Sequence, residues 1–250
     1  MKQQTTELPL VDIAKAVRQA YDAAEIDTVN LRRGIVPLYT LIEAFPIRVE
    51  EINDLTYQRA IIFLRAETGR DMPVPTQPNR TLAGYLYVYE YAHYFYGCIL
   101  INKSDPVIRR RFTAAHELGH YLLHFLPLLE SGLSREDHEV LVLAEGLTYG
   151  EREIESELPT GQLTFGNEGG NLLNLHQNDI RKIEREANQF AAELLMPQEA
   201  CTALVRHFLP RYGSRRDVLA KRLATTLLVS NTAMLNRLKN LRLPDDLILS

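Results

Sequence analysis

The chain has 250 residues, which is enough to bury one sizeable core or to form two small domains. Hydrophobic residues make up 46% and charged residues 24%, as in ordinary globular proteins, and no apolar run is long enough to span a bilayer. Two cysteines exclude a disulfide framework, and the N-terminus shows no apolar signal core, so we expect a soluble cytoplasmic protein.

Charge is distributed unevenly along the chain. Residues 201–250 hold nine Lys or Arg against three Asp, a net charge of +6, whereas the whole chain carries −4 and its first 200 residues therefore −10. This basic segment is either a solvated surface or a docking face for DNA or an acidic partner. The sequence leaves both interpretations open.

The N-terminal half combines predicted helices with short predicted strands. Apolar periodicity predicts helices over 8–24 and 36–44. Runs rich in β-branched and aromatic residues predict strands over 47–50, 59–64, 84–91 and 97–102. Asp105 and Pro106 then predict a helix start, with Asp105 as N-cap and Pro106 in the first turn, and the helix is expected to reach residue 124. Strands followed by this helix predict a small α+β fold.

The C-terminal half begins with a poorly patterned segment, residues 126–177, which we interpret as an insertion. It contains the alternating acids Glu151, Glu153, Glu155 and Glu157, and one short helix is predicted over 134–147. Such a segment is a lid, a binding loop or disordered. Helices are predicted after it over 179–197, 198–208, 215–225 and 231–240, the last capped by Ser230. We expect a domain over 1–200, with the insertion, and a separate helical segment over 201–250.

The helix predicted around residue 116 carries an HExxH motif, His116-Glu117-Leu118-Gly119-His120. Residues four apart lie on one helix face, so His116 and His120 can bind one zinc ion, and Glu117 can serve as general base for its water. An HExxH can arise by chance on a surface, but the apolar neighbours here favour a site. A helix interior disfavours glycine, so Gly119 indicates close packing or open space beside it.

Catalytic zinc normally has three protein ligands, so a third ligand is needed. His124 shares the histidine face but sits about 12 Å along the axis from His116, at roughly 1.5 Å per residue, which favours a supporting role or simple packing. On the 179–197 helix, Glu184 falls inside the apolar arc and Glu186 outside it, at about 100° per residue. We therefore predict Glu184 as the third ligand, with a salt bridge at the helix edge as the alternative, and expect Glu186 to be solvated. Asn188, one turn further, is placed to orient a ligand histidine.

RRFTAAHELGHYLLH and EREANQFAAELLMP resemble the two motifs of the ImmA/IrrE family of metallopeptidases. The family pattern also selects Glu184. The resemblance implies a zincin-like α+β core and a zinc-dependent endopeptidase of the cytoplasm that cleaves XRE-type helix-turn-helix repressors, relieving repression in stress or DNA-damage responses or in mobile-element control. The ending VSNTAMLNRL is similar to the helical ending of the family and looks like a degenerate helix-turn-helix, although its Met and Leu spacing is also typical of simple packing.

Several alternatives stay open. A DNA- or protein-binding regulator with a structural metal would need a fourth protein ligand, for which His138 or His176 is available. The toxin half of a toxin–antitoxin pair would use the same chemistry. A His, His, Glu site also accepts Mn²⁺. Tyr121 and His124 are the nearest candidates in the sequence for an oxyanion donor.

Overall fold

The computed structural model describes residues 11–27, 34–72, 77–91, 94–127, 141–144, 162–165, 177–244 and 247. Its helices are α1 (Ile13–Ala23), α2 (Leu38–Glu43), α3 (Tyr57–Thr68), α4 (Val107–His120), α6 (Gln177–Leu195), α7 (Gln198–Tyr212), α8 (Arg216–Leu227) and α9 (Asn231–Asn240). A short π-helix, η2 (Tyr121–Phe125), continues α4. The strands are β1 (Ile47–Ile52), β2 (Gly84–Tyr91), β3 (Tyr94–Asn102), β4 (Leu141–Ala144) and β5 (Gln162–Phe165). The predicted mixture of helices and strands is confirmed.

The strands form one sheet in the order β1-β3-β2-β4-β5. Strand β1 runs parallel to β3, with Ile47 opposite Gly97, and β2 pairs with β3 as an antiparallel hairpin. Strands β4 and β5 come from the 126–177 segment and extend the sheet beyond β2. The helix predicted over 134–147 is therefore wrong for residues 141–144, because these residues pair with β2. The rest of that range lies outside the described residues.

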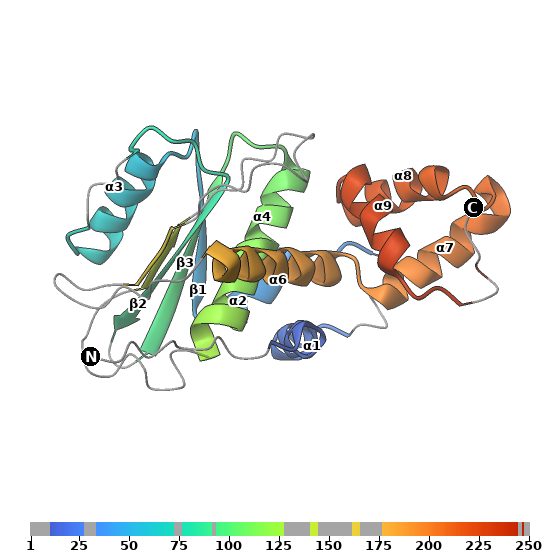
Figure 1. Cartoon of the computed structure of the whole chain (residues 1–250), viewed down its shortest axis with the longest axis horizontal. Helices are drawn as coiled ribbons and strands as arrows, with labels where there is room; N and C mark the ends of the chain where they lie inside the picture. The colour runs from blue at the N-terminus through green and yellow to red at the C-terminus, as the bar shows by residue number, and fades with distance from the viewer. Residues whose placement is uncertain are drawn as a thin grey trace.

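The two faces of the sheet are covered by different helices, as expected for strands whose side chains alternate. Leu86 and Ile99 point toward a core shared with α1, α2, α4 and α6, whereas Tyr85 and Leu100 point toward α3. Figure 1 shows α3 on one side of the sheet and α4 and α6 on the other. The HExxH helix therefore lies directly against the sheet, inside the larger core.

The strand predicted over 59–64 is instead helix α3. Its buried residues, Ala60, Ile61 and Leu64, follow the helical period, whereas Ile62 between them is 59% exposed. The side chain of Thr56 accepts a hydrogen bond from the backbone N–H of Arg59 at 3.3 Å, and Gly69 ends the helix in the left-handed conformation at φ 68°. Caps at both ends and a 3.6-residue period outweigh the β-prone composition.

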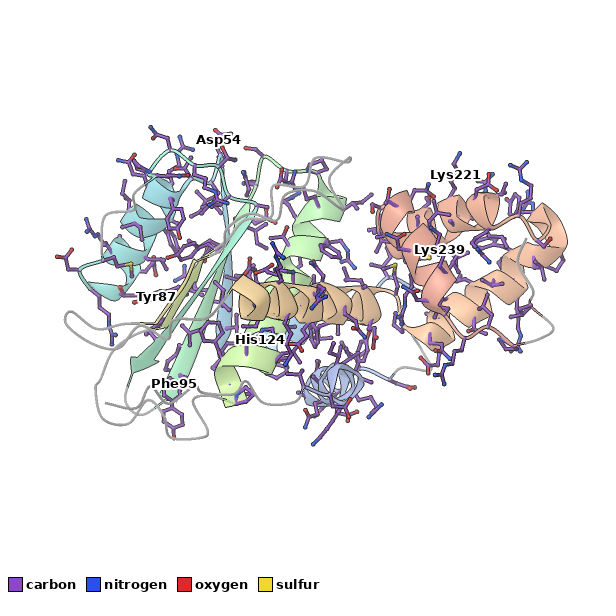
Figure 2. All side chains as sticks on the ribbon, viewed as in Figure 1. Asp54, Tyr87, Phe95, His124, Lys221 and Lys239 are labelled. Carbon is purple, nitrogen blue, oxygen red and sulfur yellow. The ribbon has the colours of Figure 1, made fainter. Side chains whose placement is uncertain are left out.

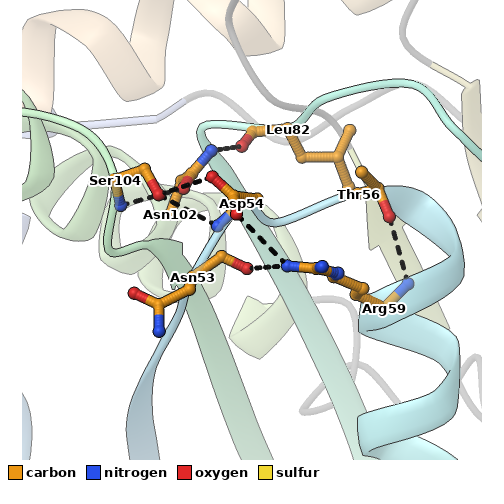
Figure 3. A network of polar contacts seen from close by, with 7 residues as sticks. All are labelled: Asn53, Asp54, Thr56, Arg59, Leu82, Asn102 and Ser104. Carbon is orange, nitrogen blue, oxygen red and sulfur yellow. Dashed lines mark hydrogen bonds and ion pairs between the residues drawn. The ribbon is translucent and has the colours of Figure 1, made fainter.

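A polar network holds the turns next to the start of α4 (Figure 3). The hydroxyl of Ser104 donates to Asp54 Oδ1 at 2.8 Å, and the amide of Asn102 donates to the carbonyl oxygen of Leu82 at 3.1 Å. The prediction that Asp105 is the N-cap of α4 was wrong. Pro106 takes that position without a side-chain cap, and the Asp105 carboxylate instead pairs with Arg109 Nε at 3.3 Å. The network and this ion pair stabilise the turn in which the chain leaves β3 and enters α4.

Helices α7, α8 and α9 gather beyond the end of α6 (Figure 1), and Ser230 caps α9 by accepting from the N–H of Ala233 at 3.1 Å, as predicted. The apolar core runs without a break from the sheet through Leu194 into these helices, and Met234 and Leu238 of α9 are buried in it. Arg237 also donates to the carbonyl oxygen of Met196 at 3.0 Å. The division at residue 200 and the helix-turn-helix likeness stay predictions.

Candidate metal and catalytic site

Helices α4 and α6 meet at Gly119. A Cβ added there would lie 3.0 Å from Phe190 Cδ1 and 3.3 Å from the Cα of Ala187, both on α6. An alanine would require Phe190 or the backbone at Ala187 to shift by a few tenths of an ångström, so the glycine, which a helix interior disfavours, permits the close approach of the two helices. This contact brings the histidines of α4 next to the polar positions of α6.

His116, His120 and Glu184 converge between these helices. His116 Nε2 lies 3.4 Å from Glu184 Oε2, His120 Nε2 lies 3.4 Å from Glu184 Oε1, and the two Nε2 atoms are 2.9 Å apart. Both histidines are buried, and the Glu184 side chain is 17% exposed. Within the described ranges this is the one group of His, Cys, Asp or Glu with ligand atoms close enough to share a metal ion.

These separations fit a small tetrahedral metal ion. Ligand atoms at about 2.0–2.1 Å from a tetrahedral zinc ion lie about 3.3 Å from one another. Each histidine nitrogen has one Glu184 oxygen at about this spacing, Oε2 for His116 and Oε1 for His120, and the two nitrogens need only a small separation to reach it. Two imidazole nitrogens and one carboxylate are also a donor set that zinc accepts. The site suits a divalent ion, whose identity as Zn²⁺ or Mn²⁺ stays a prediction.

The ring nitrogens that face away from the cluster are also held. His116 Nδ1 lies 3.1 Å from Asn188 Oδ1, and His120 Nδ1 lies 3.2 Å from His124 Nδ1. The structure thus places Asn188 in the predicted contact with a histidine of the motif. His124 lies behind His120, outside the three-residue group, at the lower end of α4 beside α6 (Figure 2).

Glu186 is only partly exposed and pairs with His124, so the prediction that it is solvated was wrong. Its Oε2 lies 3.2 Å from His124 Nε2, and its side chain is 18% exposed. A helical wheel placed Glu186 outside the apolar arc of its own helix. It could not show that η2, at the end of α4, presents His124 to that edge of α6. The sequence signal for this pair was the third histidine of the four-residue series, which we assigned only a supporting role or packing.

Glu117, the predicted general base, lies buried between α4 and the sheet. It is 2% exposed, and a Cβ added at Gly84 of β2 would lie only 2.8 Å from its Oε1. The same Cβ would lie still closer to Thr113 Cγ2. Gly84 is therefore the opening in the sheet that accommodates the Glu117 side chain, and nothing in the sequence pattern marked it.

Tyr121 occupies a different environment. It is 1% exposed, its ring packs toward Gly97 of β3, and its hydroxyl donates to the carbonyl oxygen of Phe95 at 3.5 Å. Tyr121 therefore contributes to the core beneath the sheet. The oxyanion role suggested by its position in the sequence stays a prediction.

Burial and mutual contact shift the pKa values of the whole group in the metal-free chain. Burial raises the pKa of Glu117 to about 8 and lowers that of His120 to about 4. Burial would raise the pKa of Glu184, but His120 and His116 lower it well below its usual range. The pKa of His116 is raised, because Glu184 outweighs the effect of burial. Glu184 is thus an anion ready to bind a cation, and His120 is neutral, as a ligand must be.

We expect Gly84→Ala to destabilise the protein by about 1–3 kcal/mol, as overpacking of a tight interior does, and to reduce any activity that depends on Glu117. The added methyl group must displace Thr113 or Glu117. Gly34→Ala is the matched control, because a Cβ there meets nothing within 4 Å. Urea unfolding of both variants checks the expectation, and equal stability of the two would contradict it.

We also expect Glu117→Gln to stabilise the metal-free chain in a pH-dependent way. Folded Glu117 keeps its proton up to about pH 8, whereas the unfolded side chain releases it near its ordinary pKa of 4.5. The folded state binds more protons in this window, so its stability decreases as pH rises through it. The variant has no such proton. Its stability relative to the wild type should therefore increase from about pH 4.5 to about pH 8 and stay constant above that range. Urea unfolding at a series of pH values measures this, with exposed Glu199→Gln as the control expected to run parallel to the wild type.

Metallopeptidases are the class of protein that combines an α+β core with such a His–His–Glu group and an adjacent glutamate. Residues 74–141 and 131–239 match the family model of the IrrE N-terminal-like domain, peptidase family M78. The matches together cover more than half of the chain, which therefore belongs to this family. Among curated proteins, none is similar enough to match. In the part of the chain that the structure describes, no helix has the length and apolar character needed to cross a membrane.

Proposed function

We propose that this chain is a zinc-dependent endopeptidase of the cytoplasm, with His116, His120 and Glu184 as metal ligands. The observation that carries the proposal is their convergence, with three ligand atoms within 4.8 Å of one another, beside the buried Glu117. A zinc ion bound there would supply Lewis-acid polarisation of a scissile carbonyl group. Membership of the M78 family supports a metallopeptidase in general.

The chain's own residues supply the remaining chemistry. A cation held by the adjacent ligands would lower the raised pKa of Glu117, and its ionised carboxylate then takes a proton from the attacking water and returns it to the leaving amine. The space opposite Gly84 holds its carboxylate in place, so that the group is oriented before a substrate arrives. Asn188 and His124 orient the two histidine rings from behind.

The proposed substrate is an XRE-type helix-turn-helix repressor, as the family resemblance implies. Such a repressor has a basic DNA-reading face, to which an acidic surface is complementary. The acidic residues 151–157 are the candidate for that surface, and they lie outside the described residues. Contact between the basic 201–250 segment and DNA stays an open prediction.

The second candidate is a DNA- or protein-binding regulator whose metal is structural. The net charge of +6 in residues 201–250 favours it. A closed metal site would need a fourth protein ligand, and His138 and His176 both lie outside the described residues. Glu117 argues for the enzyme, because a purely structural site has no use for a general base. X-ray absorption of the zinc-loaded protein separates the two, since four protein ligands would support the regulator.

Co-incubation tests the proposed function directly. The purified chain is loaded with Zn²⁺ or Mn²⁺ and mixed with the XRE-type repressor encoded beside it, and mass spectrometry detects the fragments. We expect cleavage that a chelator stops and added metal restores. A metal-loaded chain that leaves the repressor intact would reject this substrate, and failure to cleave a library of unfolded polypeptides as well would reject the peptidase activity.

A further inference from the structure

A line of polar contacts, buried at its inner end and partly buried at Glu186, continues from the proposed metal site to the outer edge of α6. His120 Nδ1 lies 3.2 Å from His124 Nδ1, and His124 Nε2 lies 3.2 Å from Glu186 Oε2. His120 and His124 are 4% and 6% exposed, so the contact between them is shielded from water, whereas the Glu186 side chain is 18% exposed. At the outer end, Lys182 Nζ approaches Glu186 Oε1 at 3.9 Å and is itself half-exposed.

The protons in this line can be placed in only one way once His120 faces a metal ion. A neutral imidazole carries one N–H and one lone pair, and the ligand nitrogen must offer its lone pair. His120 Nε2 faces His116 and Glu184, so its proton is on Nδ1. His124 Nδ1 then accepts that proton's hydrogen bond, and His124 Nε2 donates to the Glu186 carboxylate.

The two ligand histidines therefore have unlike partners. His116 Nδ1 donates to the neutral amide oxygen of Asn188, whereas His120 is backed by a second histidine that is itself bound to a carboxylate. A partner that draws on the Nδ1 proton makes the opposite nitrogen a better donor to a metal. The Glu186 carboxylate thus acts on His120 through the ring of His124, because it makes His124 Nδ1 a stronger acceptor for the His120 Nδ1 proton.

We propose that His124 and Glu186 form a positioning dyad, which fixes the tautomer and ring orientation of His120 and strengthens it as a metal ligand. The proposal rests on the metal site of the proposed function. Neither residue touches the metal or the substrate in this scheme. The alternative is that the pair only stabilises the packing of η2 against α6. Its loss would then lower stability and leave the metal site unchanged.

The test uses the full chain and Zn²⁺ or Co²⁺ as probes. His124→Leu and Glu186→Ala should each weaken zinc binding by about 10–100-fold, the range for the loss of such supporting contacts. His124→Asn retains a side-chain acceptor near the Nδ1 position and should recover part of the loss. Lys182→Met is the matched control, because it removes only the distant outer contact, and it should bind zinc like the wild type.

Two readouts separate positioning from simple packing. The visible absorption bands of the Co²⁺-loaded protein report the ligand field, and they should shift in His124→Leu and Glu186→Ala but not in Lys182→Met. Urea unfolding of the metal-free variants reports packing alone. Variants that lose stability but keep the zinc affinity and the Co²⁺ spectrum of the wild type would overturn the dyad.

Failure of the dyad and failure of the proposed function give different results. If the wild type cleaves protein and the dyad variants bind zinc normally, the dyad is wrong and the peptidase stands. If the wild type binds zinc without cleaving anything, and the variants bind it more weakly, the dyad stands and the peptidase falls. A wild type that binds no divalent metal overturns both. If His124→Leu fails to fold, His124→Asn and Glu186→Ala still decide the outcome.

Discussion

Glu117→Gln is expected to keep its metal and to lose peptide-bond cleavage by about 10²–10⁴-fold, the range for a lost general base. Glutamine has nearly the shape of glutamate, so it fits the space opposite Gly84 that holds the native side chain. It does not accept a proton from water near neutral pH. His116, His120 and Glu184 keep their mutual contacts, because none of these contacts involves Glu117.

Metal content and cleavage rate of the Glu117 variant must be measured on the same preparation. Glu199→Gln, an exposed substitution of the same kind at the start of α7, is the matched control and should cleave like the wild type. A metal-loaded Glu117→Gln that retains full activity would show that another group takes the proton. Loss of both metal and activity would instead move Glu117 from the role of base to that of ligand or support.

The parts of the fold that local signals specify could be predicted from the sequence. Ser230 caps α9 through its own hydroxyl, and strands β2 and β3 follow from their β-rich composition. The inward position of Glu184 also follows from local information, because one turn of helix fixes it relative to the apolar Ile183 and Ala187. In these cases the residues of one segment are sufficient to predict its conformation and which of its faces is buried.

Helix α3 was missed because its β-prone composition hid two local signals, the caps at Thr56 and Gly69 and the helical period of its buried residues. The other features that sequence reasoning missed depend on a second element. Strand β4 exists because β2 offers it an edge, which no local pattern can reveal. Glu186 looked solvated on its own helix because its partner His124 comes from another.

Gly84 is the most instructive omission at the site. A glycine at the start of a strand has many explanations, and only the approach of Thr113 and Glu117 from α4 reveals this one. Gly119 was different, because glycine in a helix interior is itself a signal that something packs closely. The burial of Glu117 thus depends on a residue 33 positions earlier in the chain, on a strand that carries no other predicted site residue.

Glu184→Ala is expected to remove high-affinity metal binding, with a larger loss than the about 10–100-fold expected for Glu186→Ala. The Glu184 carboxylate contacts both histidine nitrogens, with Oε2 at 3.4 Å from His116 Nε2 and Oε1 at 3.4 Å from His120 Nε2, so it completes the three-residue ligand group. Burial keeps this anion away from water, and the histidines hold its pKa low, so the folded chain keeps a negative charge ready for a cation. Among the described residues, Glu186 forms ion-pair contacts with His124 and Lys182, and His124 separates it from His120 and the proposed metal.

Equilibrium zinc titration of Glu184→Ala, Glu184→Gln and Glu186→Ala ranks the two carboxylates. Glu184→Gln retains the side-chain volume between α4 and α6, and it separates loss of the ligand charge from collapse of the packing. Both Glu184 variants should bind zinc more weakly than Glu186→Ala, and metal-free Glu184→Gln should still unfold cooperatively in urea. The opposite order of zinc affinities would make Glu186 the third ligand. The helix α6 would then have to turn about its axis by roughly the 200° that separates residues two apart, carrying Asn188 away from His116.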